Sequence, residues 1–360
     1  MKKSLIALAV LAAAGAASAQ SSVTLFGIVD ATVAFGKGSL TDKTQLTNSG
    51  YNSSRLGFRG TEDLGGGMSA SFWLEAGVNN DNGTGAATNT NNQTTGGAVA
   101  GIGGGQGLTF NRRSTVSLAG GWGELRLGRD YNPQFWNLTV FDPFGTNGVG
   151  TTQVLNSNSA ITGPINVRSS NSIGYFLPGN LGGFYGQAQY YMGENNKNGA
   201  ATEDDGTGLA ARFGFANGPF NVALAVARTK YATTATTGDV KSINIGGQWD
   251  FGMAKLMGEY SRDTRESIVE LEGKGGLIGA LVPVGAGEIR AAVSTYKFDT
   301  GSKARKLALG YVHNLSKRTA LYATFAHVKN DGGSTQALNG ATTAANDKST
   351  GYDFGVRHSF

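Results

Sequence analysis

The side chains that most often carry out chemistry are scarce in this sequence. It contains no cysteine, and its three histidines, His313, His327 and His358, all lie near the C-terminal end. Their spacing matches no metal-binding motif, and no H-E-x-x-H sequence occurs. The glycine-rich stretches lack the Lys-Ser/Thr pair of a phosphate-binding loop, and no serine or aspartate stands out as a nucleophile beside a histidine. We therefore expect no catalytic residues, no metal site and no cofactor.

The arginines offer another kind of chemistry, because a guanidinium stays charged at physiological pH and attracts anions. Side chains alternate between the two faces of a strand, so Arg55 and Arg59 share one face while Leu56 and Phe58 share the other. The same alternation separates Arg168 and its neighbouring serines from Ile173 and Tyr175, and it separates Arg113 from Val116 and Leu118. These arginines therefore fall on the polar faces of predicted strands.

The elements that must position these arginines are strands with one apolar face. Residues 68–78 alternate Met, Ala, Phe, Leu, Ala and Val with Ser, Ser, Trp and Glu, and residues 184–192, 220–226 and 242–251 repeat this two-residue period. The final segment, "GYDFGVRHSF", alternates in the same way up to Phe360. Such a strand can close a barrel by pairing with the first strand near Ser22, which leaves no free edge.

The composition and the N-terminus favour a barrel in a membrane. A charged start, a short apolar run and Ala17-Ser18-Ala19 predict a signal peptide over residues 1–19, with the mature chain starting near Gln20. The chain has 57 Gly and only 39% hydrophobic residues, so it is polar on average, as transmembrane β-barrels are. The formal charge of +5, about +3 without Lys2 and Lys3, is too small and dispersed to indicate nucleic acid.

The connections alternate between short turns and long loops, the latter at 36–53, 79–107, 131–167, 193–206 and 331–350. Counting the segments between them predicts 16 antiparallel strands in one barrel domain over residues 20–360. Short turns at one rim and long loops at the other are the plan of an outer-membrane barrel, in contrast to a sandwich or a propeller. Phe360 would then lie at the periplasmic interface, as in the C-terminal targeting signal of such proteins.

Several motifs together resemble the general porins of β-proteobacteria. They are "SSVTLFGIVD", "SRLGFRGTEDLGGG", "GELRLGRDY", "FDPFGTNG", "RSSNSIGYFLP" and the closing "HSF", which occur in order along the whole chain. The resemblance implies a homotrimer of 16-stranded barrels in the outer membrane of a Gram-negative bacterium. It also implies that the third external loop folds into the lumen, and the long 131–167 segment suits that role.

A loop inside a water-filled lumen would create a constriction. We expect Arg55, Arg112 and Arg168 to face Asp142 of the loop there, with Arg59 as a further candidate. The resemblance favours Arg112 and simple alternation favours Arg113, so both stay candidates. Such a ring of arginines favours passive diffusion of small anions and hydrophilic solutes.

Three alternatives remain open at this point. The barrel could be a channel specific for one anion, or a surface adhesin or anchor with long Gly/Asn/Thr-rich loops. An arginine near a strand end could instead be a solvated rim residue or a partner for lipopolysaccharide. Outer-membrane lipid and lipopolysaccharide are the expected surroundings in each case.

Overall fold

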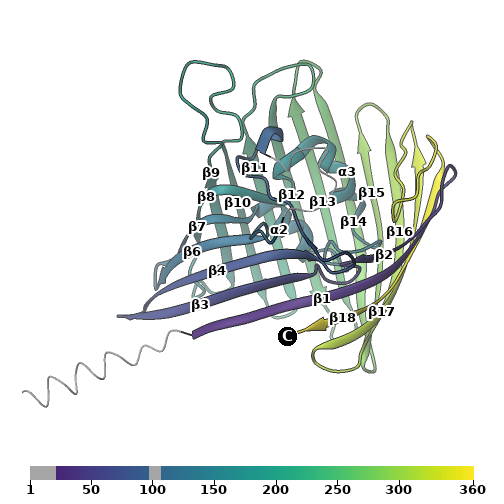
Figure 1. Ribbon diagram of the computed structural model, residues 1–360, viewed down its shortest axis with the longest axis horizontal. Coiled ribbons are helices and arrows are strands. Elements are labelled where there is room, and N and C mark those ends of the chain that lie inside the picture. The colour runs from purple at the N-terminus through teal and green to yellow at the C-terminus, as the bar shows by residue number, and fades with distance from the viewer. Residues whose placement is uncertain (1–21, 97–106) are drawn as a thin grey trace, which may run out of the picture.

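The protein folds into a sheet that closes on itself (Figure 1). The computed structural model describes residues 22–96 and 107–360, so the predicted signal peptide and its cleavage site lie outside the described residues. The strands are β1 (Ser22–Lys37), β2 (Lys43–Asn48), β3 (Arg55–Gly65), β4 (Met68–Asn79), β5 (Thr84–Gly85), β6 (Arg113–Gly120), β7 (Gly123–Tyr131), β8 (Arg168–Phe176), β9 (Phe184–Tyr191), β10 (Gly208–Asn217), β11 (Phe220–Thr229), β12 (Asp239–Asp250), β13 (Lys255–Glu266), β14 (Leu271–Val284), β15 (Gly287–Phe298), β16 (Lys303–Asn314), β17 (Thr319–Asp331) and β18 (Lys348–Ser359). The helices are η1 (Thr94–Gly96), α2 (Pro133–Val140), α3 (Gln153–Thr162) and η2 (Gly163–Ile165).

All strand pairs in the described residues are antiparallel, and the ring closes where β18 pairs with β1. Two short strands, β2 and β5, belong to the first and second external loops, and the other 16 form the wall, as predicted. Among the described residues, no helix is long and apolar enough to cross a membrane.

The two faces of the wall differ as the two-residue period requires. On β12, Ile243 and Ile245 are exposed on the outside, whereas Ser242 and Asn244 are buried on the inside. The same alternation runs around the barrel, so large apolar side chains cover its outer surface. An outward apolar band with a polar interior suits lipid outside and water inside.

The third external loop, between β7 and β8, carries α2 and α3 and folds into the barrel, as predicted (Figure 1). Asn132 caps α2 by accepting a hydrogen bond from the Gln134 N–H, and Pro133 occupies the first turn, where its missing N–H costs nothing. Asn137 then donates from Nδ2 to the inward-facing Asn244 Oδ1 at 2.8 Å. The helices α2 and α3 lie against β9–β16, which leaves the β3–β8 side of the interior facing the loop.

The register of barrel closure corrects one expectation. Phe360 exchanges two backbone hydrogen bonds with Gly27, each 3.1 Å long, and Ser359 lies opposite Ile28. Ser22 pairs with Thr61 on the other edge of β1, and it has no partner in β18 because β1 extends beyond the end of β18. The last strand therefore closes on the first as predicted, but Phe360 pairs five residues further along β1 than Ser22, since strand stagger cannot be read from a single strand.

Removing Phe360 should impair assembly more than it weakens the assembled barrel. The deletion removes one pair of closing hydrogen bonds and a side chain that is 44% exposed, so the folded wall loses little. We expect the truncated protein to accumulate unassembled in the periplasm, measured by membrane fractionation. Assembly equal to that of the full chain would argue against a targeting role for this residue.

Candidate constriction site

The interior wall opposite the third loop encloses a cavity of about 530 Å³. Its charged lining consists of five arginines and two carboxylates, an excess of three positive charges: Arg55, Arg112, Arg113, Arg126, Arg212, Glu75 and Asp130. Tyr131 and Trp136 line it as well and come from the end of β7 and from α2. The cavity therefore lies between the arginine-rich wall and the start of the inward loop.

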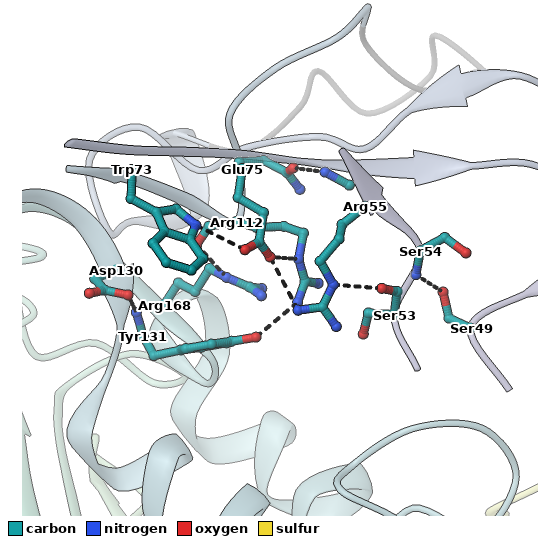
Figure 2. A network of polar contacts seen from close by, with 12 residues as sticks. Ser49, Ser53, Ser54, Arg55, Trp73, Glu75, Arg112, Asp130, Tyr131 and Arg168 are labelled. Atoms are coloured by element: carbon teal, nitrogen blue, oxygen red, sulfur yellow. Dashed lines mark hydrogen bonds and ion pairs between the residues drawn. The ribbon is translucent and has the colours of Figure 1, made fainter. Parts of the chain in front are cut away.

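Glu75 on β4 joins two of the arginines (Figure 2). Its Oε1 accepts from Arg112 Nε at 2.5 Å and lies 3.4 Å from Arg55 Nη1, while its Oε2 accepts from Trp73 Nε1 at 3.0 Å. Arg112 also donates to the Tyr131 hydroxyl at 2.9 Å. One carboxylate therefore fixes two guanidiniums and leaves one positive charge uncompensated at this point.

A second carboxylate, Asp130, holds the next two arginines. Its Oδ2 accepts from Arg126 Nη1 at 2.6 Å and lies 3.6 Å from Arg113 Nε. Arg126 also makes a two-point contact with Glu124, at 2.9 and 3.0 Å, nearer the short turn between β6 and β7. Paired donors of this kind fix a guanidinium in orientation as well as position.

Aromatic rings hold the guanidiniums without neutralising them. Arg126 lies 3.9 Å from the centre of the Phe176 ring, and Arg113 lies 4.6 Å from that of Trp73. Arg168 and Arg212 stack in the same way on Tyr131 and Tyr185, at 4.5 and 4.8 Å. Cation–π contacts orient a cation and keep its charge available. The wall can therefore present ordered positive charge to an anion in the lumen.

The structure brings together most of the predicted arginines but gives them different positions. Arg55, Arg112 and Arg113 line the cavity, whereas Arg168 lies behind it and donates from Nε to the Arg112 carbonyl at 2.8 Å. Arg59 is exposed nearer the β3–β4 turn and packs over Phe26 and Trp73 at 5.2 and 5.1 Å.

Arg112 and Arg113 both reach the cavity because Arg112 precedes the regular strand. β6 begins at Arg113, and the Arg112 N–H still donates to the Glu75 carbonyl at 3.1 Å. Strict alternation of faces does not extend to a residue at such a strand entrance. Both candidates, Arg112 and Arg113, therefore line the cavity.

The position expected for Asp142 is wrong. Its side chain is only 3% exposed, and its carboxylate accepts from the backbone N–H groups of Phe144, Thr146 and Thr152 at 2.9–3.1 Å. Burial raises the pKa of this carboxyl above its ordinary value, while those three donors and the nearby Lys306 act against the rise. Asp142 therefore shapes the loop from within and does not face the arginines.

The acids that do contact the arginines were missed, as were Arg126 and Arg212. Glu75 was visible as the charged member of the Ser-Ser-Trp-Glu face of residues 68–78, and Asp130 and Arg126 share one face of β7. Nothing in one sequence says that these faces meet around one cavity, because that depends on the stagger between strands. In the described residues, no cluster of three or more His, Asp or Glu side chains could hold a metal ion.

A closed antiparallel barrel with an inward loop and an arginine-lined interior defines a β-barrel membrane channel. The family model described as Gram-negative porin matches residues 5–333. Outer membrane porin protein 32 of Delftia acidovorans is 40% identical over the full length of both chains, and an outer membrane porin protein of Bordetella pertussis is 31% identical over the same extent. The solved structure of an anion-selective porin from Comamonas acidovorans superposes with a TM-score of 0.82 at 37% identity, covering 95% of this chain and 100% of that one. This chain belongs to the Gram-negative porin family, as its motifs indicated.

Replacing Glu75 by glutamine tests how the acid restrains the wall. The substitution frees Arg55 and Arg112 from their shared counter-charge, so the positive excess of the cavity rises. We expect anion preference to increase and stability to fall by about 1.5–3 kcal/mol, the value of hydrogen bonds to charged groups. Reversal potentials and thermal unfolding of the same preparation measure the two effects, and unchanged selectivity would place Glu75 outside the ion path.

Proposed function

We propose that this protein is an outer-membrane porin whose constriction is the arginine-lined cavity described above. It forms a water-filled channel for passive diffusion of small hydrophilic solutes and favours anions. Its mature part, from about Gln20 to Phe360, is a single barrel domain in the outer membrane of a Gram-negative bacterium, in contact with lipid and lipopolysaccharide. The family membership and the relatives' outer-membrane descriptions support this placement.

The observation that carries the proposal is the imbalance of charge at the narrow side of the lumen. Five arginines and two carboxylates line the cavity, Glu124 outside the lining pairs with Arg126, and aromatic rings keep the guanidiniums in place. Rings of Arg or Lys select anions because they raise the local anion concentration. The similar solved structure described as anion-selective supports the same preference. The constriction needs no catalytic or cofactor chemistry to act in this way.

Single-channel recording in planar bilayers tests the proposal against its rivals. A general porin gives stepwise conductance that rises in proportion to salt concentration for many small ions. A channel specific for one anion gives a current that saturates with that anion, and an anchor with a filled lumen gives almost no current. Either of the last two results would replace the proposal.

We further propose that three chains assemble into a homotrimer, which the resemblance to general porins implies. The sequence of the second external loop, residues 79–107, contains the apolar stretch "AVAGIGG" at 98–104, which we expect to reach a neighbouring chain and which lies outside the described residues. The described part of that loop contacts its own barrel, where Asn92 accepts from the Ser170 N–H at 2.7 Å and donates to its carbonyl at 3.0 Å.

Sedimentation in detergent should therefore return the mass of a trimer. A chain lacking residues 97–106 should give a trimer that dissociates at lower temperature, while its barrel keeps the same strand content by circular dichroism. A monomer from the intact chain would contradict the proposed assembly.

A further inference from the structure

The outer face of β15–β18 carries basic side chains near the external end of each strand. Lys297, Lys303, Lys329 and Lys348 share the parity of the outward apolar residues on their strands, and all but the half-buried Lys303 are exposed. Arg305 is also outward and exposed. These five side chains form a basic row above the apolar band of the barrel.

The strand register places like charges directly opposite one another in this row. Lys297 lies opposite Lys303 between β15 and β16, Arg305 lies opposite Lys329 between β16 and β17, and Lys329 lies opposite Lys348 between β17 and β18. Like charges in directly opposed positions destabilise a sheet. The arrangement therefore gains stability when an anion lies across the row.

The acids near the row neutralise little of it. Asp331 lies opposite Lys303, but its carboxylate is 3.7 Å from the Arg305 guanidinium, and both of these side chains are about half exposed. Asp347 accepts from the backbone N–H of Lys348. Within the described residues, none of the four lysines has a carboxylate within ion-pairing distance.

Below the basic row, the same strands form an apolar groove of about 410 Å³ on the outer surface. Ile289, Leu309, Tyr311, Phe325, Tyr352 and Phe354 line it. Phe325 precedes Lys329 by four residues on β17, which corresponds to about 13 Å along a strand. A positive row and an apolar groove at this spacing match a molecule with an anionic head and an alkyl chain.

We propose that the outer face of β15–β18 binds a phosphorylated, acylated lipid of the surrounding leaflet. Its phosphate groups lie along the row formed by Lys297, Lys303, Lys329 and Lys348, and one acyl chain lies in the groove between Leu309 and Phe354. The inference rests on the proposed function, because it requires the barrel to stand in the outer membrane. Beyond the location of the barrel, the inference defines a lipid site in which the basic row binds the head group and the apolar groove binds the acyl chain.

The test uses lipid A carrying its phosphates and the same lipid after phosphatase treatment, titrated into delipidated protein in detergent and detected by native mass spectrometry. We expect the wild type to prefer the phosphorylated form by at least about tenfold, and Lys329→Gln/Lys348→Gln to lose about 30-fold in affinity, about fivefold for each basic residue at a membrane surface. The matched control Lys255→Gln/Lys317→Gln removes the same charge at the opposite rim and should bind as the wild type does. Ala323→Phe, which fills the groove, should weaken both lipid forms.

Equal affinities of the two lysine variants, or equal binding of the two lipid forms, would overturn the proposal. A cysteine placed at Ala323 could also cross-link to a second copy of the chain. If that cross-link formed equally well in the presence of phosphorylated lipid, the groove would be a protein contact and the proposal would be overturned. Conductance of the same preparations separates this site from the channel function. If conductance is normal and the lysine substitutions do not change lipid binding, the lipid site is refuted and the channel function stands. If lipid binds as proposed but the protein does not conduct, the channel function is refuted and the lipid site stands.

Discussion

Replacing Arg55 and Arg113 together by glutamine should remove roughly two thirds of the channel's anion preference, because selectivity follows the local excess of charge. The excess around the cavity falls from three positive charges to one, since both carboxylates remain. The side chains of Arg55 and Arg113 are 22% and 21% exposed, so a glutamine at either position remains solvated and leaves no buried cavity. Glu75 keeps its 2.5 Å contact with Arg112, and Asp130 keeps its 2.6 Å contact with Arg126, so the barrel should retain its stability.

The measurement is the reversal potential of single channels in a potassium chloride gradient. Lys197→Gln/Lys230→Gln is the matched control, because it removes two exposed charges from the external loops around Asp204. That control should keep the wild-type reversal potential. If the control loses selectivity and the arginine variant does not, the filter lies at the mouth of the channel and not at the cavity.

Replacing Asp142 by alanine should loosen the third external loop. Three backbone N–H groups lose their buried acceptor, and the buried Lys306 loses a nearby negative charge. Each buried donor left without a partner costs about 1–3 kcal/mol, so a total on the order of 3 kcal/mol is expected after local relaxation. The open channel should become noisy on the millisecond scale, and residues 131–167 should become sensitive to protease.

The matched variant Asp142→Asn keeps one acceptor oxygen and the shape of the side chain. It should give an intermediate loss of stability with little change in reversal potential, because the side chain is only 3% exposed and contacts its own loop. A clear gain in anion preference with a quiet channel would instead mean that Asp142 acts as a charge in the pore, as the sequence alone had led us to expect.

The sequence predicted the fold well because a barrel repeats one simple rule. Each wall strand must show lipid an apolar face, so the period of two is visible in nearly every segment, and loop lengths give the two rims. The same rule placed Arg55 and Arg113 on the inner face. The short strands β2 and β5 were not predicted, since they extend hairpins within loops where no lipid imposes alternation.

The site was only partly predictable because it is built across strands. Glu75 meets Arg112 although a long external loop separates them in the chain, and Arg212 reaches the same cavity from β10. Such meetings depend on strand stagger, which a single sequence does not encode locally. The position of Asp142 was predicted wrongly for a related reason. An acid before Pro-Phe in a loop can point into water or back onto its own backbone, and here three backbone N–H groups bind its carboxylate within the loop.

The reversal potential of the wild-type channel in a potassium chloride gradient, recorded in dilute and in concentrated salt, tests the central claim most directly. The guanidiniums are partly exposed at the lining of the cavity, so salt in the lumen should screen their charge, because the Debye length falls from about 8 Å at physiological ionic strength to about 3 Å at 1 M. We predict a potential of the sign that anion passage gives, large in dilute salt and smaller in concentrated salt. A potential of zero, or of the opposite sign, in dilute salt would contradict the assignment of the arginine-lined cavity as the selectivity filter.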